Sequence, residues 1–159
     1  MSAESHAIRT VEQLLEVLDL DSTQARTTED IFTGASHPMP TGRIYGGQVL
    51  AQSLIAAERT LPENRPVHSM HGYFLRPGDA EHGLTIAVDR IHDGRSFSTR
   101  RSQAYQNGVP NFSMIASAQD EDHGVEHAME VPSGIPEPES IAPDEDAVQG
   151  LPGGTMRML

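Results

Sequence analysis

The sequence predicts an α+β domain in which one long helix is covered by an antiparallel sheet. Residues 42–61 (GRIYGGQVLAQSLIAAERTL) carry apolar side chains around most of the helical circumference, which is typical of a buried helix. Four extended runs follow, at residues 67–76, 84–92, 96–106 and 109–119. Asp93-Gly94 and Asn107-Gly108 separate the last three runs, and both dipeptides favour hairpin turns because their residues tolerate positive φ. A helix followed by a meander indicates the α+β class.

Length and charge indicate one folded domain and a tail. The chain has 159 residues, which suits a single core. Residues 120–159 contain ten acidic side chains, one basic residue, five of the 11 prolines and no aromatic residue. We therefore expect a single domain over residues 1–119 and an acidic, proline-rich linker or disordered tail over residues 120–159. An acidic partner-binding segment is the alternative, although such segments are usually only solvated.

Composition argues against several classes of function. Residues 1–119 carry 13 acidic and ten basic side chains, so this nearly neutral body is not expected to bind nucleic acid, and the acidic tail would repel phosphate. The chain has no cysteine, which excludes disulfides and cysteine-based metal or redox sites. No signal peptide and no apolar segment of about 18 residues is present, so we expect no membrane span and a cytoplasmic location.

The remaining elements follow from periodicity. Apolar residues at positions 11, 14, 15 and 18 predict a short amphipathic helix that docks through that face. Residues 29–34 predict a first strand, and prolines at positions 38 and 40 mark the loop into the long helix. In the last strand one face is predicted to meet the helix because apolar residues alternate with polar ones. These apolar residues are Phe112, Met114, Ala116 and Ala118.

The start of the long helix is the first candidate binding element. Gly46 and Gly47 leave backbone N–H groups uncapped, and these groups with the helix dipole attract a negative oxygen or a polarised carbonyl. Glu58 is the only carboxylate of this helix, and it lies about 16 Å along the axis from the glycines. A general base near the helix start is therefore not evident.

Histidines and serines give no catalytic or metal site. His68 and His71 stand three residues apart on a predicted strand, so their side chains point to opposite faces and cannot bind one ion. We expect one to be a hydrogen-bonded core or rim histidine and the other to be exposed. His123 and His127 lie in the acidic tail and are expected to be solvated. No serine stands in a Gly-x-Ser-x-Gly sequence, and no glycine-rich phosphate loop is present.

Three arginines surround the Asp93-Gly94 turn, and two interpretations of them stay open. Arg95, Arg100 and Arg101 could hold the phosphates of a charged carrier, because the planar guanidinium binds phosphate with two hydrogen bonds. Pairing with acidic residues on neighbouring strands explains them equally well.

Four motifs in order resemble one family. They are GRIYGGQVLAQSLIAA (42–57), VHSMHGYFLRPGD (67–79), DGRSFSTRRSQAYQNG (93–108) and FSMIASAQ (112–119). Together they resemble the amino-terminal half of type II acyl-CoA thioesterases over roughly residues 10–140. The resemblance implies a hot-dog fold, in which an antiparallel sheet wraps round a long central helix. Members of that family are about twice as long and carry two hot-dog domains.

The resemblance also implies an activity, the hydrolysis of fatty acyl-CoA to free fatty acid and CoA without a cofactor. Backbone donors at a helix start would stabilise the negative charge on the thioester oxygen. The catalytic Asp of the family begins an Asp-His-Ser motif in the second domain, whereas this chain has Val67-His68-Ser69 at the matching place. Val67 cannot activate water, so the catalytic residues stay unassigned. The predicted substrate-binding residues are Gly46, Gly47, Arg95 and Arg100.

Two further functions stay open. The main alternative is a non-catalytic hot-dog module that binds acyl-CoA or pairs with a partner domain. A hot-dog dehydratase is a weaker alternative, because it would need a His and a carboxylate meeting across subunits. In each case an uncovered sheet edge predicts a homodimer or pairing with a second hot-dog domain.

Overall fold

A computed structural model describes residues 10–23, 28–37, 39 and 42–141. The chain divides into two compact units, Met1–Asp122 and His123–Leu159. The first unit contains every helix and strand except one short 3₁₀ helix of the described residues. The domain boundary that the sequence predicts at residue 119 stays a prediction.

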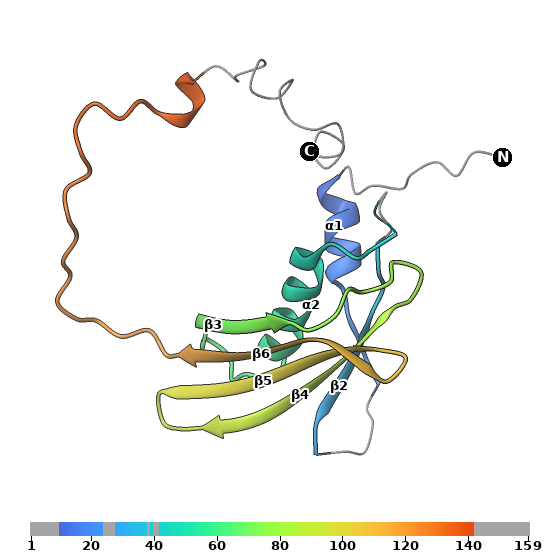
Figure 1. The fold of residues 1–159 in the computed structure, drawn as a ribbon. Coiled ribbons are helices and arrows are strands. Elements are labelled where there is room, and N and C mark those ends of the chain that lie inside the picture. The colour runs from blue at the N-terminus through green and yellow to red at the C-terminus, as the bar shows by residue number, and fades with distance from the viewer. Residues whose placement is uncertain (1–9, 24–27, 38, 40–41, 142–159) are drawn as a thin grey trace. The chain divides into compact units, whose positions relative to one another are not determined.

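The first unit is a six-stranded antiparallel sheet with two helices, and α2 lies against one face of the sheet (Figure 1). The strand order is β1-β2-β4-β5-β6-β3, so the predicted meander of three consecutive strands is confirmed. The predicted α+β class is confirmed as well. The elements are α1 Val11–Leu18, β1 Asp21–Ser22, β2 Asp30–Gly34, α2 Gly46–Glu58, β3 Val67–Phe74, β4 Leu84–Asp93, β5 Phe97–Gln106 and β6 Val109–Gln119.

Both predicted hairpin turns occur where the sequence places them. Asn107 and Gly108 have φ of 50° and 76°, which is the left-handed region that this dipeptide adopts easily. At the other turn, the Gly94 N–H donates to the Phe97 carbonyl at 2.8 Å. The two turns fix the register of β4, β5 and β6, which form the centre of the sheet.

The core lies between α2 and the inner face of the sheet. The predicted alternation of β6 is confirmed, because its four inward apolar residues are buried. Asn111 departs from the pattern: it is predicted to be on the wetter face but is buried. The core cluster includes Val49, Ala56, Ala57, Leu84, Ile86, Val88, Ala104, Phe112, Met114 and Ala116.

The buried face of α2 is more polar than its sequence predicts. Gln48 and Gln52 are buried, whereas the larger Leu54 and Ile55 are only half buried. The amides are buried because they bind backbone groups: Gln48 donates to the Ala35 carbonyl at 2.9 Å, and Gln52 donates to the same carbonyl at 2.9 Å. These bonds attach the segment after β2 to α2.

The docking face predicted for α1 is wrong. Val17 is the buried residue of this helix, at 7% exposure, whereas Val11 and Leu15 are 67% and 61% exposed. The helix is instead held near its C-terminal end, where the Val17 carbonyl accepts from the Gln52 amide at 2.6 Å. That contact orients α1 so that the predicted apolar face points outward.

In the second unit, the described residues 123–141 form extended chain with one 3₁₀ helix, Pro138–Ser140. These residues are all exposed. Residues 142–159 lie outside the described residues, and the predicted disorder of the tail stays a prediction. Across the ranges that the structure describes, no helix is long and apolar enough to span a membrane.

Candidate functional site

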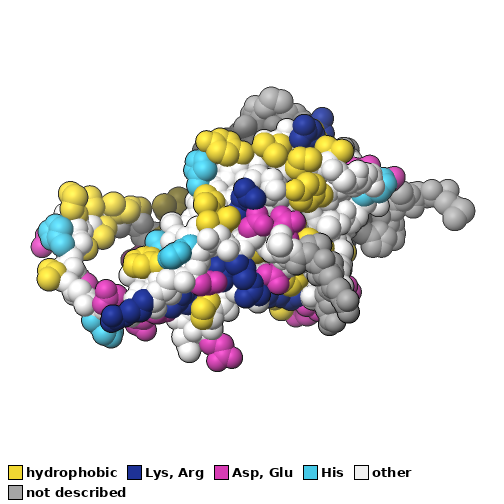
Figure 2. All heavy atoms as spheres, turned by 90° about the horizontal axis from the view of Figure 1, so that it is seen from below, with side chains coloured by type: hydrophobic (Ala, Val, Ile, Leu, Met, Phe, Trp, Pro, Cys, Tyr) yellow, Lys and Arg dark blue, Asp and Glu magenta, His cyan; other side chains and the backbone are white. Residues whose placement is uncertain are grey.

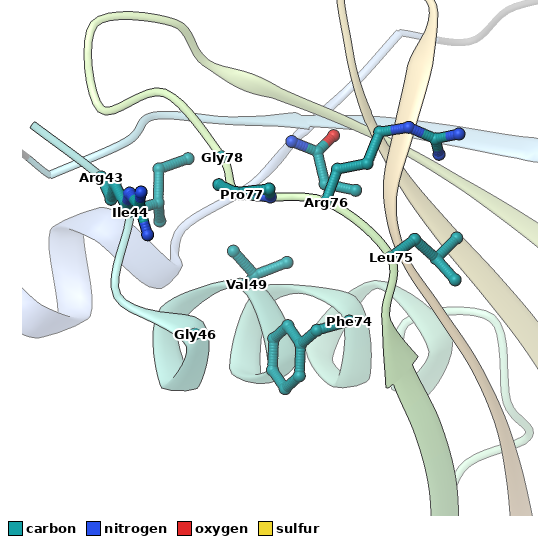
Figure 3. A pocket seen from close by; sticks show the side chains of 10 residues that line it. Arg43, Ile44, Gly46, Val49, Phe74, Leu75, Arg76, Pro77 and Gly78 are labelled. Carbon is teal, nitrogen blue, oxygen red and sulfur yellow. The ribbon is translucent and has the colours of Figure 1, made fainter.

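The candidate site is a pocket of about 330 Å³ at the start of α2 (Figure 3). Three separate segments form it: the loop before α2 with its first turn, the loop after β3, and the beginning of β6. Figure 3 shows Gly46 and Val49 on the helix and Pro77 and Gly78 on the loop across from them. The lining residues are Arg43, Ile44, Gly46, Val49, Phe74, Leu75, Arg76, Pro77, Gly78 and Asn111.

Backbone hydrogen bonds hold the two loops of the pocket together. The Ile44 N–H donates to the Gly78 carbonyl at 3.0 Å, and the Ala80 N–H donates to the Gly42 carbonyl at 3.1 Å. Between these bonds, Arg43 and Asp79 form an isolated antiparallel bridge. The mouth of the pocket is therefore a short two-stranded ribbon, although both segments are loops by sequence.

Two buried amides support this ribbon from the sheet. Gln106 donates to the Asp79 carbonyl at 2.7 Å and to the His82 carbonyl at 2.6 Å, and its Oε1 accepts from the Asp79 N–H at 2.8 Å. The same Oε1 accepts from the Asn111 amide at 3.0 Å. Because Gln106 meets two carbonyls with its donors, its orientation is fixed, and so is that of Asn111. The 78–82 loop is thereby held in place.

The N-terminus of α2 brings uncapped donors to the pocket. Tyr45 is the N-cap residue, and its side chain makes no capping hydrogen bond. The N–H groups of Gly46 and Gly47 have no acceptor within the described part of the chain. A Cβ at Gly46 would lie 3.2 Å from the Phe74 ring, so glycine permits the close approach of this ring. The helix start therefore offers backbone donors beside an apolar wall.

Positive charge surrounds the pocket, and none of its lining residues is acidic. Arg43 and Arg76 contribute guanidinium groups from the two opposing loops. The nearby Asp79 has a pKa below its ordinary value, because its carboxylate accepts from the Glu81 N–H and also from His82. The carboxylate is ionised at neutral pH, and the hydrogen bonds that it accepts stay within its own loop.

These groups can bind and polarise a ligand but cannot activate water. A developing oxyanion would be stabilised by the α2 donors. General-base catalysis needs a carboxylate or imidazole within hydrogen-bond reach, and no lining residue supplies one. No group of three His, Asp or Glu residues that could hold a metal ion occurs among the described residues.

The structure separates the four predicted substrate-binding residues into two groups. Gly46 lines the pocket and Gly47 follows it, at the level where β3 ends. Arg95 lies in the turn after β4, and its carbonyl accepts from Arg65, which precedes β3. Since β3 spans about 23 Å, Arg95 lies near the other end of this strand, whereas the Arg100 backbone is level with Met70 in its middle. The structure thus does not bring the glycines and arginines together within one chain.

Arg100 is 1% exposed and makes five hydrogen bonds inside the protein. It binds the Thr60 hydroxyl at 2.7 Å and the Asp93 carboxylate at 2.8 Å. Arg101 pairs with Asp89 across two strands. Of the two interpretations of these arginines, pairing with acidic residues is the one seen for Arg100 and Arg101, and the predicted binding role of Arg95 stays a prediction.

The β3 histidines are both exposed. His68 Nε2 lies 3.0 Å from Ser117 Oγ, and His71 stacks edge-on against Tyr73. The predicted hydrogen bond is seen for His68, but His68 is exposed like His71. No carboxylate hydrogen-bonds to His68 within the described residues, so the Ser117–His68 contact lacks the third member of a catalytic triad.

Sequence reasoning did not identify four residues of this site, namely Arg43, Arg76, Gln106 and Asn111. The Arg-Pro-Gly-Asp run at 76–79 was a usable signal, because a rigid turn after a strand places the preceding arginine at the sheet edge. Gln106 and Asn111 gave no signal, because polar residues beside a hairpin turn are normally solvated.

The comparisons with known proteins agree on one family. The acyl-CoA thioesterase N-terminal domain family matches residues 35–119, which include α2 and all strands from β3 to β6. Acyl-coenzyme A thioesterase 8 of Homo sapiens is 38% identical over 114 residues, covering 71% of this chain and 35% of that protein. Acyl-CoA thioesterase 2 of Haemophilus influenzae is 39% identical over 108 residues, covering 67% of this chain and 38% of that protein.

Solved structures show the same relation and confirm the hot-dog fold. TesB2, an acyl-CoA thioesterase II from Mycobacterium marinum, has a TM-score of 0.66 and 39% identity, covering 79% of this chain and 45% of that one. The E. coli PaaI protein has a TM-score of 0.58 at 16% identity, which shows the fold alone.

This chain covers less than half of the length of thioesterase 8, thioesterase 2 and TesB2. This chain spans a little more than a third of the two curated relatives and 45% of the TesB2 chain. The family match covers more than half of this chain, and the relatives match it at nearly 40% identity. The chain therefore belongs to the acyl-CoA thioesterase N-terminal domain family.

Proposed function

We propose that this chain is the substrate-binding half of an acyl-CoA thioesterase and that a second hot-dog domain supplies the catalytic base. The observation that carries the proposal is the pocket itself. It combines Gly46, whose N–H has no acceptor among the described residues, with a lining that contains no acidic residue, and Gly47 follows next in the helix. Such a site can hold a thioester and stabilise its oxyanion, but it needs a base from elsewhere.

The sheet edge supports this composite site. β3 is the last strand of the sheet and pairs only with β6, so no described residue of the first unit pairs with its other edge. It contains no Asp, Glu, Lys or Arg, the residues that usually protect an exposed edge. An antiparallel partner strand, centred on the middle of β3, would place its own first residue beside Phe74 and the pocket.

This geometry gives Val67 a new interpretation. Val67 begins β3, about 23 Å along the strand from the pocket of its own chain. The matching position of an antiparallel partner strand would lie beside the pocket instead. In the family resemblance that position holds the catalytic Asp of the second domain, so its carboxylate would reach a thioester bound at Gly46.

The proposed reaction is the hydrolysis of a fatty acyl-CoA. The Asp of the second domain removes a proton from water while the water oxygen bonds to the thioester carbon. The carbonyl oxygen becomes negative and is stabilised by the N–H groups at the start of α2. The carbon–sulfur bond then breaks, the CoA sulfur receives the proton, and the products are the fatty acid and free CoA.

Substitution of Val67 tests the proposal. The unmodified chain should hydrolyse octanoyl-CoA poorly, because loss of a general base typically lowers the rate by about 10²–10⁴. Val67→Asp should recover part of that loss through pairing of two copies. A Val67→Asp, Gly46→Leu double variant should be inactive alone and should gain activity when mixed with the unmodified chain, whose pocket is intact.

Three outcomes would contradict this function. Rapid turnover by the unmodified chain that His68→Ala abolishes would make histidine the base. Activity of Val67→Asp that the mixing experiment cannot transfer would place the base and the pocket in one chain. A chain that stays inactive with both Val67→Asp and an added second domain, yet binds octanoyl-CoA, would favour the non-catalytic binding module.

Pairing through β3 has its own test. We propose a homodimer, or a pair with a second hot-dog domain, because an uncharged edge with exposed Tyr73 and Phe74 favours strand addition. Sedimentation velocity should show dimers at micromolar concentration, and Tyr73→Lys should shift them to monomers. A monomeric unmodified chain would contradict this pairing.

We also propose the cytoplasmic location that the sequence predicts, and cell fractionation tests it.

A further inference from the structure

Most of the arginines that the structure describes are paired, and the two at the pocket are not. The structure describes eight arginines, and five form ion pairs with carboxylates. Figure 2 shows arginine and acidic side chains beside one another on one face of the molecule. Arg43, Arg76 and Arg95 form no ion pair within the described residues, and the first two line the pocket. The paired arginines are Arg59, Arg65, Arg90, Arg100 and Arg101.

A shortage of acidic residues does not explain this difference. The sequence contains 23 acidic and 11 basic side chains. Asp79 is even the backbone neighbour of Arg43 in the bridge at the pocket mouth. Its carboxylate accepts instead from the Glu81 N–H at 2.9 Å and from His82 Nδ1 at 3.0 Å. The guanidinium of Arg43 is therefore left without a carboxylate although one lies on the adjacent residue of the ribbon.

The guanidinium of Arg76 is held at the rim by a single hydrogen bond to the backbone. One guanidinium N–H donates to the Pro110 carbonyl at 2.9 Å, and the other guanidinium donors have no partner within the described residues. Figure 3 shows its side chain directed away from Val49, with Arg43 on the other side of the pocket. Both guanidinium groups can therefore contact the part of a ligand that extends beyond the pocket.

We propose that Arg43 and Arg76 bind the phosphate groups of coenzyme A. This rests on the proposed function in one respect, that the thioester end of acyl-CoA enters the pocket. A volume of about 330 Å³ is near the lower limit for a drug-sized ligand, so most of an acyl-CoA must lie outside it. Guanidinium groups bind phosphate with paired hydrogen bonds. Arginines on opposing loops fit several separated phosphates better than the single carboxylate of a fatty acid.

Calorimetric titration of the full chain tests this site without any catalysis. The probes are coenzyme A, dephospho-coenzyme A, pantetheine and octanoate. Arg43→Gln and Arg76→Gln should each weaken coenzyme A binding about tenfold, because each removes charge-assisted hydrogen bonds. Pantetheine has no phosphate and should bind these variants and the unmodified chain equally. Coenzyme A binding should also weaken as salt is added.

Arg59→Gln is the matched control, because it removes one positive charge at the opposite end of α2, about 20 Å from the pocket. It should bind coenzyme A like the unmodified chain. Circular dichroism of each variant checks that it is folded, and Arg43→Lys should restore part of the affinity that Arg43→Gln loses.

Several results would overturn the assignment. Coenzyme A binding that is absent, or unchanged in both glutamine variants, would exclude these arginines. So would binding weakened only by Arg95→Gln, or octanoate binding that depends on Arg43 as strongly as coenzyme A binding does. Loss of coenzyme A affinity in both variants without any hydrolysis after second-domain addition would uphold this site and reject the proposed thioesterase activity instead.

Discussion

Arg100 is the largest fully buried side chain of the described residues, and its charge is held by neighbours from three segments. Its guanidinium binds Thr60 at the end of α2, Asp93 at the end of β4, and the carbonyls of His92 and Thr99. A buried charge is tolerated only when it is paired and hydrogen-bonded. Arg100 thus links the C-terminal end of α2 to the β4–β5 hairpin.

Removal of the Asp93 carboxylate should show how much this link contributes to the stability of the fold. Asp93→Ala leaves the buried Arg100 without its anionic partner and the Ser98 hydroxyl without its acceptor. Asp93 is half exposed, so water will replace part of the interaction, and we expect a loss of about 1–2 kcal/mol in the free energy of unfolding. Urea denaturation measures it. Asp30→Ala, which breaks an exposed pair with Arg90, should change stability by less than about 0.5 kcal/mol. Equal losses in both variants would contradict the role of Arg100.

Acid should destabilise the domain through carboxylates that accept hydrogen bonds in the folded state. The pKa of Asp93 lies below its ordinary value because it accepts from Ser98 and from Arg100, and the pKa of Asp120 is lowered by Arg65. A lowered folded-state pKa adds stability above the unfolded value of about 3.9, and this is lost as the pH falls through the folded value. Burial and Asp89 raise the pKa of Glu29, which acts in the opposite direction.

We therefore expect the urea midpoint to fall as the pH drops below about 4, since the three carboxylates whose pKa is lowered outweigh the single one whose pKa is raised. Asp93→Asn should show a smaller fall over that range. Identical pH profiles for the variant and the unmodified chain would mean that Asp93 does not contribute to acid sensitivity.

Among the elements, every strand except the two-residue β1 was predictable, and the buried faces of the helices were not. The β4–β6 meander follows from Asp93-Gly94 and Asn107-Gly108, because turn chemistry acts over a few residues. The face of α2 was mispredicted because Gln48 and Gln52 are buried to bind the backbone of distant segments. Which backbone groups need partners depends on tertiary structure and is not visible in helical periodicity.

The Asn107-Gly108 turn allows a test at this scale. Gly108 has φ of 76°, a conformation in which a side chain is strained, and a Cβ there would meet no atom within 4 Å. Gly108→Ala should therefore lower the free energy of unfolding by about 1 kcal/mol through backbone strain alone. Gly124→Ala, in extended chain with open space around it, should be neutral. Thermal denaturation followed by circular dichroism compares them, and an unchanged Gly108→Ala midpoint would show that the turn does not limit stability.

At the scale of the molecule, the candidate site could be predicted only in part. Gly46 was identified because uncapped donors are a local property of a helix start. The pocket also needs Arg43, Arg76 and Asn111, which lie on segments joined by the bridge between residues 43 and 79 and by the Gln106 amide. That bridge forms between two loops, and no periodic pattern in the sequence predicts it. The catalytic base that we propose could not be predicted from this sequence either, because an antiparallel edge contact would bring it from another domain.

The division of the chain into body and tail leads to the last prediction. The first unit ends at Asp122, and Asp120 is tied to it by two hydrogen bonds from Arg65 at 2.7 Å and 3.1 Å. Beyond the Arg65–Asp120 ion pair, residues 123–141 are exposed and have almost no regular hydrogen bonding. Proteases cut exposed chain that can enter their active sites, so limited proteolysis should leave a resistant body that ends near residues 120–135. Mass spectrometry of the fragments locates the cut.

A variant without the Arg65–Asp120 ion pair makes the proteolysis experiment more specific. Arg65→Met removes both side-chain bonds to Asp120 and so loosens the end of β6, although the Gln119 and Asp120 N–H groups still donate to Pro66 and Ser96. The same protease should therefore cut closer to Gln119 and faster. Arg59→Met serves as the control, because its partner Asp19 belongs to the segment after α1 and not to the tail. A tail as resistant as the sheet in the unmodified chain would instead mean that residues 123–141 are protected by packing on a second domain or a second copy.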